Sequence, residues 1–254
     1  MNSKITILTD GSHRSVQANS LAKYLDDYNG AKQIVISCGI DVVDKAIELK
    51  NSNTFLVSIL DPTKHHEQFD LIVVPEHDPL PKGNVVTTKG LLNHITPELL
   101  AQNTRDFNLP KPVIAVLVGG RHIGGNVSQS DAVKLINYAE SKAASLLITT
   151  SKRTEDKTLE AIKSAVTKPH FIWDYNHEGQ AANPYLSMLC AADEIVVTAD
   201  SVRMCSEVAS SGKPFEIFEP EQLHFSYKKL AASLNDVSNL NEAKRVSKII
   251  KQLV

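Results

Sequence analysis

The chain has 254 residues, a formal net charge of -2 and three cysteines. Hydrophobic residues make up 42% of it and charged residues 22%, which is close to the average of globular proteins and excludes a disordered chain. The near-neutral charge disfavours a dedicated nucleic-acid binder, whose footprint is an excess of basic residues. We therefore expect a folded protein of one large or two small domains, with no nucleic-acid partner.

Cysteine, membrane and targeting signals are sparse. Cys38, Cys190 and Cys205 are an odd number at wide spacing, which is typical of thiols in a reducing compartment. No apolar run approaches the ~20 residues that span a bilayer, and the segment from Met1 to Asp10 lacks the apolar core of a signal peptide. The sequence predicts a cytoplasmic protein with no integral membrane segment, no metal site and no cofactor.

Short apolar runs alternate with helical patterns along the first half. Ala18, Leu21 and Leu25 recur at helical spacing after the first run, and Thr96 followed by Pro97 predicts the cap and the first position of a short helix. The predicted elements are strand Ile5 to Thr9, a helix through Leu25, strand Gln33 to Ser37, helix Asp41 to Leu49, strands Thr54 to Leu60, Leu71 to Val74 and Val85 to Thr87, and a helix from Pro97.

The segment from Arg105 to Pro112 contains two prolines and mixed charges, and we interpret it as a linker. The same alternation restarts after it. The predicted elements are strands Val113 to Val118, Leu146 to Thr149, Phe171 to Trp173, Ile195 to Thr198 and Phe215 to Phe218, helices Ser130 to Ala143, Glu155 to Val166, Pro184 to Ala191 and Val202 to Ser210, and C-terminal helices that reach Val254.

Continuously apolar strands between amphipathic helices predict parallel sheets that are covered on both faces. The two successions predict an α/β chain of two Rossmann-like domains, residues 1–109 and residues 110–254, with the last helix packing back on the first domain. Ligands of such sheets bind at the carboxyl ends of the strands. The loops at those ends, and a cleft between the domains, are therefore the predicted place of a site.

Gly119, Gly120 and Arg121 follow the first strand of the second half. Glycines let backbone N–H groups approach an anion, and arginine pairs with phosphate. The run has neither the G-x-G-x-x-G spacing of a dinucleotide fingerprint nor the G-K-[ST] ending of a P-loop. A phosphate-binding loop and a plain flexible loop both stay open.

The next strand is followed by Ser151, Lys152, Arg153 and Thr154, which open a helix. Hydroxyls, cations and a helix N-terminus together predict an anion site. The alternative is ordinary capping, in which Thr154 caps the helix and the cations are solvated.

Asp200 and Ser201 enter a later helix, and one of them is expected to cap it. Glu207 lies nearly opposite the apolar stripe of that helix. It is either a solvated carboxylate or an acceptor for vicinal hydroxyls, such as the diol of a ribose.

Two loops of the first half carry titratable side chains. His77 and Asp78 follow a strand and can supply a general base; a polar surface loop is the alternative. His13 lies in the turn after the first strand, where Asp10 or Ser12 is expected to cap a helix.

Taken together, these loops resemble one family. The most specific stretch runs from Ala192 to Val202 and continues through Ser206-Glu207 to Gly212-Lys213-Pro214. Further matches are Thr9-Asp10-Gly11, Asp70 to Asp78, Asn84-Val85, Gly90 to Pro97, Gly119-Gly120, Thr150 to Thr154 and Asn183-Pro184-Tyr185. They resemble the mitochondrial-fission "elongated mitochondria" family, whose bacterial members are described as predicted nucleoside-diphosphate-sugar epimerases.

The resemblance implies a fold similar to GT-B glycosyltransferases, with a nucleotide-sugar on the second domain and a glutamate, here Glu207, on the ribose. It implies an acceptor side in the first domain, with His77, Asp78 or His13 as catalytic base. Lys152 departs from the arginine that the family commonly carries there. The implied nucleotide-sugar residues are Gly119, Gly120, Arg121, Ser151, Arg153, Thr154, Asn183, Tyr185, Asp200, Ser201, Ser206 and Glu207.

Two functions follow as hypotheses. The first is a nucleotide-sugar-binding, glycosyltransferase-like enzyme, or one similar to a nucleotide-sugar epimerase, in which Arg121 and Arg153 stabilise the diphosphate leaving group. The alternative is a non-catalytic adaptor of the fission family that binds a protein partner on the same scaffold. A nicotinamide oxidoreductase is disfavoured because the dinucleotide fingerprint is missing.

Overall fold

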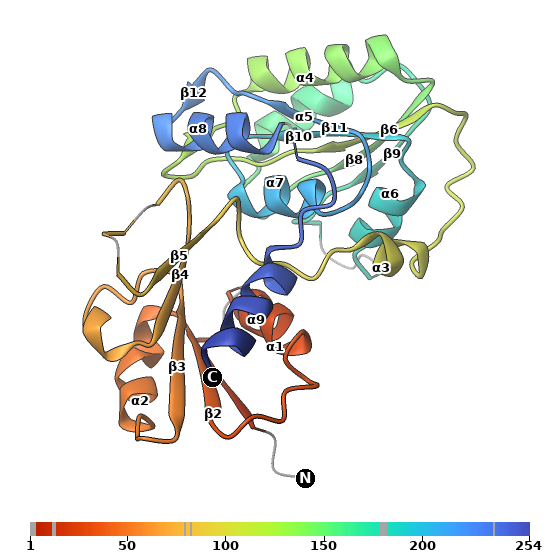
Figure 1. Cartoon of the computed structure of the whole chain (residues 1–254). Helices are drawn as coiled ribbons and strands as arrows, with labels where there is room; N and C mark the ends of the chain where they lie inside the picture. The colour runs from red at the N-terminus through yellow and green to blue at the C-terminus, as the bar shows by residue number, and fades with distance from the viewer. Residues whose placement is uncertain (1–3, 12–13, 79, 82, 178–181, 236) are drawn as a thin grey trace. The chain divides into compact units, whose positions relative to one another are not determined.

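The computed structural model describes the chain except for residues 1–3, 12–13, 79, 82, 178–181 and 236. The chain divides into two compact units, which we call unit 1 (residues 1–94 and 241–254) and unit 2 (residues 95–240) (Figure 1). Each unit is built on a five-stranded parallel sheet. The predicted α/β class, with parallel sheets in two Rossmann-like parts, is confirmed.

The sheet of unit 1 has the order β1-β2-β3-β4-β5, and all neighbours are parallel. Its strands are β1 (Ile5–Thr9), β2 (Gln33–Cys38), β3 (Thr54–Ile59), β4 (Leu71–Pro75) and β5 (Val85–Thr88). Its helices are α1 (Ser15–Lys23), α2 (Val43–Glu48) and α9 (Glu242–Leu253), with 3-10 turns η1 (Ile40–Val42) and η2 (His66–Gln68).

The two faces of this sheet are covered by different helices. Ile34 and Ile36 of β2 pack in a cluster with Leu21 of α1 and Ile250 of α9, and α1 and α9 lie side by side in Figure 1. Val35 faces the other way and packs with α2. Because the strand order advances in one direction while α1 and α2 lie on opposite faces, the two crossovers have opposite hands. One of them departs from the right-handed rule for parallel strands.

The main sheet of unit 2 has the order β11-β10-β6-β8-β9, again parallel throughout, and β7 and β12 form a short antiparallel ribbon. The strands are β6 (Val113–Leu117), β7 (Gly125–Asn126), β8 (Ser145–Thr149), β9 (His170–Trp173), β10 (Glu194–Thr198), β11 (Phe215–Phe218) and β12 (Gln222–Leu223). The helices are α3 (Pro97–Ala101), α4 (Gln129–Lys142), α5 (Asp156–Ala165), α6 (Tyr185–Ala191), α7 (Val202–Ala209) and α8 (Phe225–Leu234).

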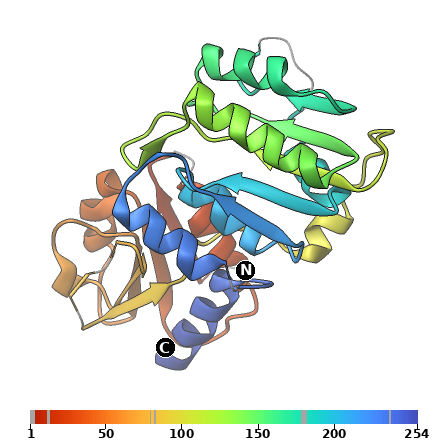
Figure 2. The ribbon, with the colours of Figure 1, turned by 90° about the horizontal axis from the view of Figure 1, so that it is seen from above.

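Helices cover both faces of this sheet. α4 and α5 lie side by side over one face (Figure 2), where Leu135 and Ile162 pack on Ile114 and Ile148. The opposite face packs on α6, α7 and α8. Helices therefore cover both faces of the sheet. The carboxyl ends of β6, β8 and β10 lie at one edge of it, and the loops that follow these strands form that edge.

The border between the units differs from the predicted one. Ile95 and Leu100 are buried in the same cluster as Val113, so α3 and the proline-containing segment belong to unit 2. The border therefore lies between residues 94 and 95, whereas the sequence placed it between 109 and 110. The composition of that segment is typical of a linker, but the apolar face of α3 holds it against α6.

The cysteines are free thiols, and Cys38 and Cys205 are buried. Burial raises the pKa of the Cys38 thiol to about 12. In the described part of the chain, no helix has both the length and the apolar character needed to cross a membrane.

Candidate functional site

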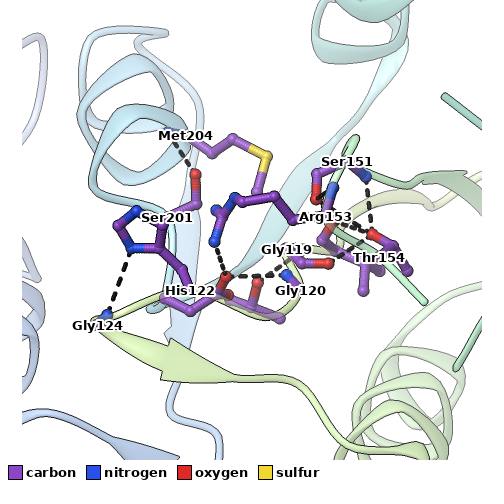
Figure 3. Close-up of polar contacts among 12 residues, drawn as sticks. Gly119, Gly120, His122, Gly124, Ser151, Arg153, Thr154, Ser201 and Met204 are labelled. Carbon is purple, nitrogen blue, oxygen red and sulfur yellow. Dashed lines mark hydrogen bonds and ion pairs between the residues drawn. The ribbon is translucent and has the colours of Figure 1, made fainter. Parts of the chain in front are cut away.

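The loops after β6, β8 and β10 are tied together at the carboxyl edge of unit 2 (Figure 3). The Gly119 amide donates to Thr198 Oγ1 at 2.8 Å, and the Gly120 amide donates to Asp200 Oδ2 at 2.9 Å. The next amide, from Arg121, donates to the Arg153 carbonyl at 3.1 Å. The loops thus form one connected surface, although they lie far apart in the sequence.

The two glycines are required by close approach. A Cβ on Gly119 would lie 2.2 Å from both carboxylate oxygens of Asp200, and a Cβ on Gly120 would lie 2.0 Å from the Arg153 carbonyl oxygen. Only glycine leaves room for these contacts. Since the amides of Gly119, Gly120 and Arg121 already donate inside the unit, an anion at this edge would be met by side chains.

Asp200 is the buried centre of the surface. Its side chain is fully buried, and Oδ2 lies 3.3 Å from Arg153 Nη1, whose side chain is 30% exposed. Burial raises the pKa of Asp200, and the hydrogen bonds from Thr198 and Gly120, together with the Arg153 charge, offset part of that shift. Asp200 therefore holds Arg153 and the Gly120 backbone in fixed positions.

Two further cations stand at this edge. The Arg121 side chain is 79% exposed, and its Nη1 lies 3.8 Å from Glu155, which also pairs with Lys157. Lys152 is exposed, with no ion pair to any residue that the structure describes. Acidic side chains therefore neutralise only part of the positive charge that Arg121, Lys152 and Arg153 bring to this surface.

Thr154 connects loops and does not cap α5. Its Oγ1 donates to the Gly119 carbonyl at 2.5 Å and accepts from the Ser151 amide at 2.9 Å. The N-cap of α5 is Glu155, without a side-chain bond. The capping alternative for Thr154 is thus wrong, because the hydroxyl is used across the loops.

Ser201 caps α7 and accepts from the Met204 amide at 3.4 Å, as expected for one of the two candidates. Ser206 is buried, and its hydroxyl donates back to the Val202 carbonyl at 2.7 Å. Ser201 therefore stabilises the start of the helix that also carries Glu207, and Ser206 has its buried hydroxyl satisfied within that helix.

Glu207 is not a solvated carboxylate. It is 1% exposed; Oε2 accepts from the Tyr185 hydroxyl and Oε1 from Arg203 Nε, each at 2.8 Å. Burial and the Glu207 charge raise the pKa of Tyr185 well above its usual range. Asn183 is exposed, and its Oδ1 accepts from the Tyr185 amide at 3.0 Å, which orders the start of α6. The face of α7 that lies opposite its apolar stripe is thus covered by the start of α6.

His122 is a member of this surface that the sequence analysis did not select. It follows Arg121, and its Nδ1 accepts from the Gly124 amide at 3.3 Å (Figure 3). Tyr227 Oη lies 3.5 Å from the same nitrogen. Burial lowers the pKa of His122, and the Arg153 charge lowers it further. The sequence feature that could have identified His122 is its position in the loop between Arg121 and the second glycine pair, Gly124 and Gly125.

The candidate base residues lie in unit 1. His77 and Asp78 follow β4; burial lowers the pKa of His77, and the Asp78 charge opposes the shift. His77 is therefore neutral near pH 7, as a general base requires. His13 lies outside the described residues, as does Ser12. The predicted cap Asp10 is replaced by Arg14, which has no side-chain cap bond; Asp10 instead pairs with Arg14 at 3.6 Å.

Across the described ranges, no group of three or more His, Cys, Asp or Glu side chains is placed to hold a metal ion. The available chemistry at the edge of unit 2 is that of guanidinium, ammonium and hydroxyl groups. These groups recognise anions such as phosphates.

These features define an α/β protein with a basic, hydroxyl-lined surface at the carboxyl edge of its second parallel sheet. A family model described as Mitochondrial fission ELM1 matches residues 6–253, and the chain belongs to this family. It is 29% identical over 240 residues to "Mitochondrial fission protein ELM1" of Arabidopsis thaliana, covering 80% of this chain and 55% of the relative. The chain thus spans about half the length of that relative.

A second relative is "Uncharacterized protein RP120" of Rickettsia prowazekii (strain Madrid E), 28% identical over 278 aligned positions, covering 86% of this chain and 78% of the relative. Because 278 positions exceed the 254 residues of this chain, the relative carries insertions.

Among solved structures, a UDP-GlcNAc 2-epimerase from Neisseria meningitidis bound to UDP-GlcNAc matches with a TM-score of 0.49 and 13% identity, covering 96% of this chain and 82% of the other. TarM matches with a TM-score of 0.44 and 11% identity, covering 93% of this chain and 54% of the other. At these scores the likeness is too low to indicate a ligand for this chain.

Proposed function

We propose that unit 2 binds the diphosphate of a nucleoside-diphosphate sugar and that the protein is a glycosyltransferase-like enzyme. The observation that carries this proposal is the tie between the loops after β6, β8 and β10, which gathers Arg121, Lys152 and Arg153 at one sheet edge. Arginine matches phosphate oxygens with two parallel donors. The family resemblance of these same loops points to the same ligand.

The two arginines have different roles in this proposal. Arg121 is 79% exposed and distant from its acid, so it makes the first contact with a diphosphate. Arg153 is held by Asp200 at 3.3 Å, so a diphosphate competes with that carboxylate for its guanidinium. Ser151 and Lys152 add a hydroxyl and a charge from the same loop.

The ribose would be held on Glu207. The half-exposed Arg203 side chain occupies Oε1, whereas Tyr185, which is partly buried and packs against the core of unit 2, occupies Oε2. A ribose diol therefore displaces Arg203 and leaves Tyr185 in place. Asn183, Ser201 and Ser206 act by fixing the helix ends and α7 around this carboxylate.

In the transfer reaction, an acceptor hydroxyl attacks the anomeric carbon as the bond from that carbon to the diphosphate breaks. The hydroxyl proton passes to a base, for which His77 is the first choice and Asp78 and His13 are the others. The leaving diphosphate gains negative charge, which Arg121 and Arg153 stabilise. Epimerase-like chemistry on the same donor is the alternative within the enzyme class.

A non-catalytic adaptor of the fission family is the second candidate. It is favoured by the internal use of the Gly119, Gly120 and Arg121 amides and by the fully paired Glu207. Polar groups that already have internal partners gain less from a ligand, because each new bond replaces an old one.

The test is titration calorimetry of the full chain with UDP-, GDP-, CMP- and ADP-sugars. We expect one donor class to bind, with at least tenfold loss, or about 1.4 kcal/mol, in Arg121→Gln and Glu207→Ala. Lys163→Gln, on the exposed side of α5, is the matched control and should bind normally. Absence of heat with every donor, together with unchanged capture of a protein partner by Glu207→Ala, would favour the adaptor.

A further inference from the structure

Unit 2 carries an exposed apolar tip beside the β7–β12 ribbon. In this ribbon Asn126 pairs with Gln222 and Gly125 with Leu223, and the His224 amide donates to the Gly124 carbonyl at 2.8 Å. Ile123 lies in the tight turn closed by His122 and Gly125, and Phe225 is the first residue of α8. The hydrogen bond from His224 to Gly124 joins the residue after Ile123 to the residue before Phe225, and so brings their backbones together. We call Ile123 and Phe225 the apolar tip.

The exposure of this tip is extreme. Ile123 is 89% exposed and Phe225 is 77% exposed, the two highest values among the described large hydrophobic side chains. Exposed aliphatic and aromatic groups that gather on one spot mark an interaction surface, whereas single ones are ordinary. We therefore interpret the apolar tip as a contact surface for a binding partner.

The backbone under the tip is fixed from the inside. A Cβ on Gly124 would lie 2.1 Å from the Tyr227 ring, and Leu230 and Leu234 bury the inner face of α8. Ile123 and Phe225 are consequently held outward by the packing of their neighbours, and the fold itself makes no use of their side chains.

Cations flank the tip. Phe225, Lys228 and Lys229 stand at positions i, i+3 and i+4 of α8, which places them on one helix face. Both lysines are exposed, and neither has an ion pair with a described residue. The nearby acid Glu221 lies at the other end of β12 and is paired with Lys134.

We propose that this tip docks unit 2 on the surface of a bilayer that contains anionic lipids. Ile123 and Phe225 enter the level of the head groups, while Lys228 and Lys229 pair with lipid phosphates. This combination of a small apolar face with flanking cations is that of peripheral membrane contacts. Docking of this kind requires no membrane-spanning helix.

A protein partner fits this surface less well. Stable protein interfaces bury about 800 Å² on each side, and an apolar tip of two protruding side chains is far smaller. A bilayer imposes no such minimum, because each inserted apolar group and each cation adds its own contribution. The small apolar area and the positive charge both favour the lipid surface.

The test is co-sedimentation of the full chain with vesicles of phosphatidylcholine and phosphatidylglycerol in equal parts, and with vesicles of phosphatidylcholine alone. We expect binding to the anionic vesicles only, weakened by salt. The pair Ile123→Ser and Phe225→Ser should lower partitioning about tenfold or more, and Lys228→Gln with Lys229→Gln should do the same.

Matched controls come from unit 1. Leu49→Ser removes another exposed apolar side chain, and Lys244→Gln with Lys248→Gln removes two exposed lysines of α9; both should bind vesicles as the parent does. Circular dichroism confirms that all variants are folded. Failure of the parent to bind anionic vesicles, or unchanged binding by the tip variants, would overturn the proposal.

The outcome is independent of the proposed sugar ligand. Nucleotide-sugar titrations are carried out without vesicles, and the Ile123→Ser and Phe225→Ser pair should retain whatever binding the parent shows. Capture of a protein or RNA that depends on the tip, in place of vesicle binding, would also overturn the lipid assignment.

Discussion

The two units share a five-stranded parallel sheet, yet they hold the loops at its carboxyl edge in different ways. In unit 2, contacts across loops join residues 79, 80 and 35 positions apart: Gly119 with Thr198, Gly120 with Asp200, and Thr154 with Gly119. In unit 1, the loop after β3 is held by exposed or partly buried side chains: Asp61 accepts from Thr63 and His66. Lys64 also pairs with Asp44, and Asn84 donates to the His66 carbonyl.

The backbone reflects this difference. Leu60, Thr63 and His65 have φ values of 70°, 62° and 57°, a region that costs non-glycine residues free energy. At the carboxyl edge of unit 2, the loops can approach each other closely because Gly119 and Gly120 have no Cβ. Unit 2 therefore presents a preorganised surface joined by buried hydrogen bonds, whereas the loop after β3 in unit 1 depends on exposed and partly buried contacts.

The largest expected effect comes from Gly120→Ala. The new Cβ would meet backbone atoms, the Arg153 carbonyl oxygen at 2.0 Å and the Thr154 nitrogen at 2.6 Å, which cannot move aside as a side chain can. We expect a loss of about 3 kcal/mol in the free energy of unfolding, measured by urea denaturation. In unit 1, Gly11→Ala has open space around the Cβ and only its φ of 72° to satisfy, so it should cost about 1 kcal/mol. Equal losses would break the comparison.

Asp200→Ala should have the next largest effect. It removes the acceptor of the Gly120 amide and the partner of Arg153 from a fully buried place. We expect a loss of about 2–3 kcal/mol, because a buried donor is left unsatisfied. Thermal unfolding followed by circular dichroism measures it, and a loss within error of zero would show that the loops do not depend on this carboxylate.

Asp61→Ala is the unit 1 counterpart and should cost less. Its contacts to the Thr63 amide at 2.7 Å and to His66 at 2.8 Å are local and partly exposed. About 1 kcal/mol or less is expected in the same unfolding measurement. A loss larger than that of Asp200→Ala would reverse the ranking of the two units.

The smallest predicted effect is a pH dependence from His77. Burial lowers its pKa below the ordinary value of 6.5, so the unfolded chain binds the proton more readily than the folded chain. Stability therefore falls as the pH drops below 6.5 and through the lowered folded pKa. Urea denaturation across this range should show the decline, and His77→Gln should flatten it. An identical slope in the variant would assign the decline to other groups.

Much of the fold follows from local pattern. Runs such as Val113 to Val118 are apolar on both faces because helices cover both sides of the sheet, and Thr96 caps α3 as predicted, accepting from the Leu99 amide at 3.2 Å. The β7–β12 ribbon was not predicted, because each of its strands has only two residues and β7 begins with a glycine. Two-residue strands carry no period to detect.

The site was only partly predictable for a different reason. The residues at strand ends could be named because topology places them at one edge. The hydrogen bond between Gly120 and Asp200 joins residues that are 80 positions apart in the sequence. The contact between Tyr185 and Glu207 depends on how α6 packs against α7. Helical spacing alone places Glu207 opposite the core stripe and thus in solvent, whereas a second helix buries it.

We propose that the carboxyl edge of unit 2 is preformed to bind a nucleotide-sugar. Hydrogen–deuterium exchange of the full chain, with and without a saturating nucleoside-diphosphate sugar, tests it most directly. We expect slower exchange in residues 119–125, 151–154, 183–185 and 199–207, which hold the diphosphate and the ribose. Unchanged exchange in all of these segments, with every one of the UDP-, GDP-, CMP- and ADP-sugars, would contradict the proposal.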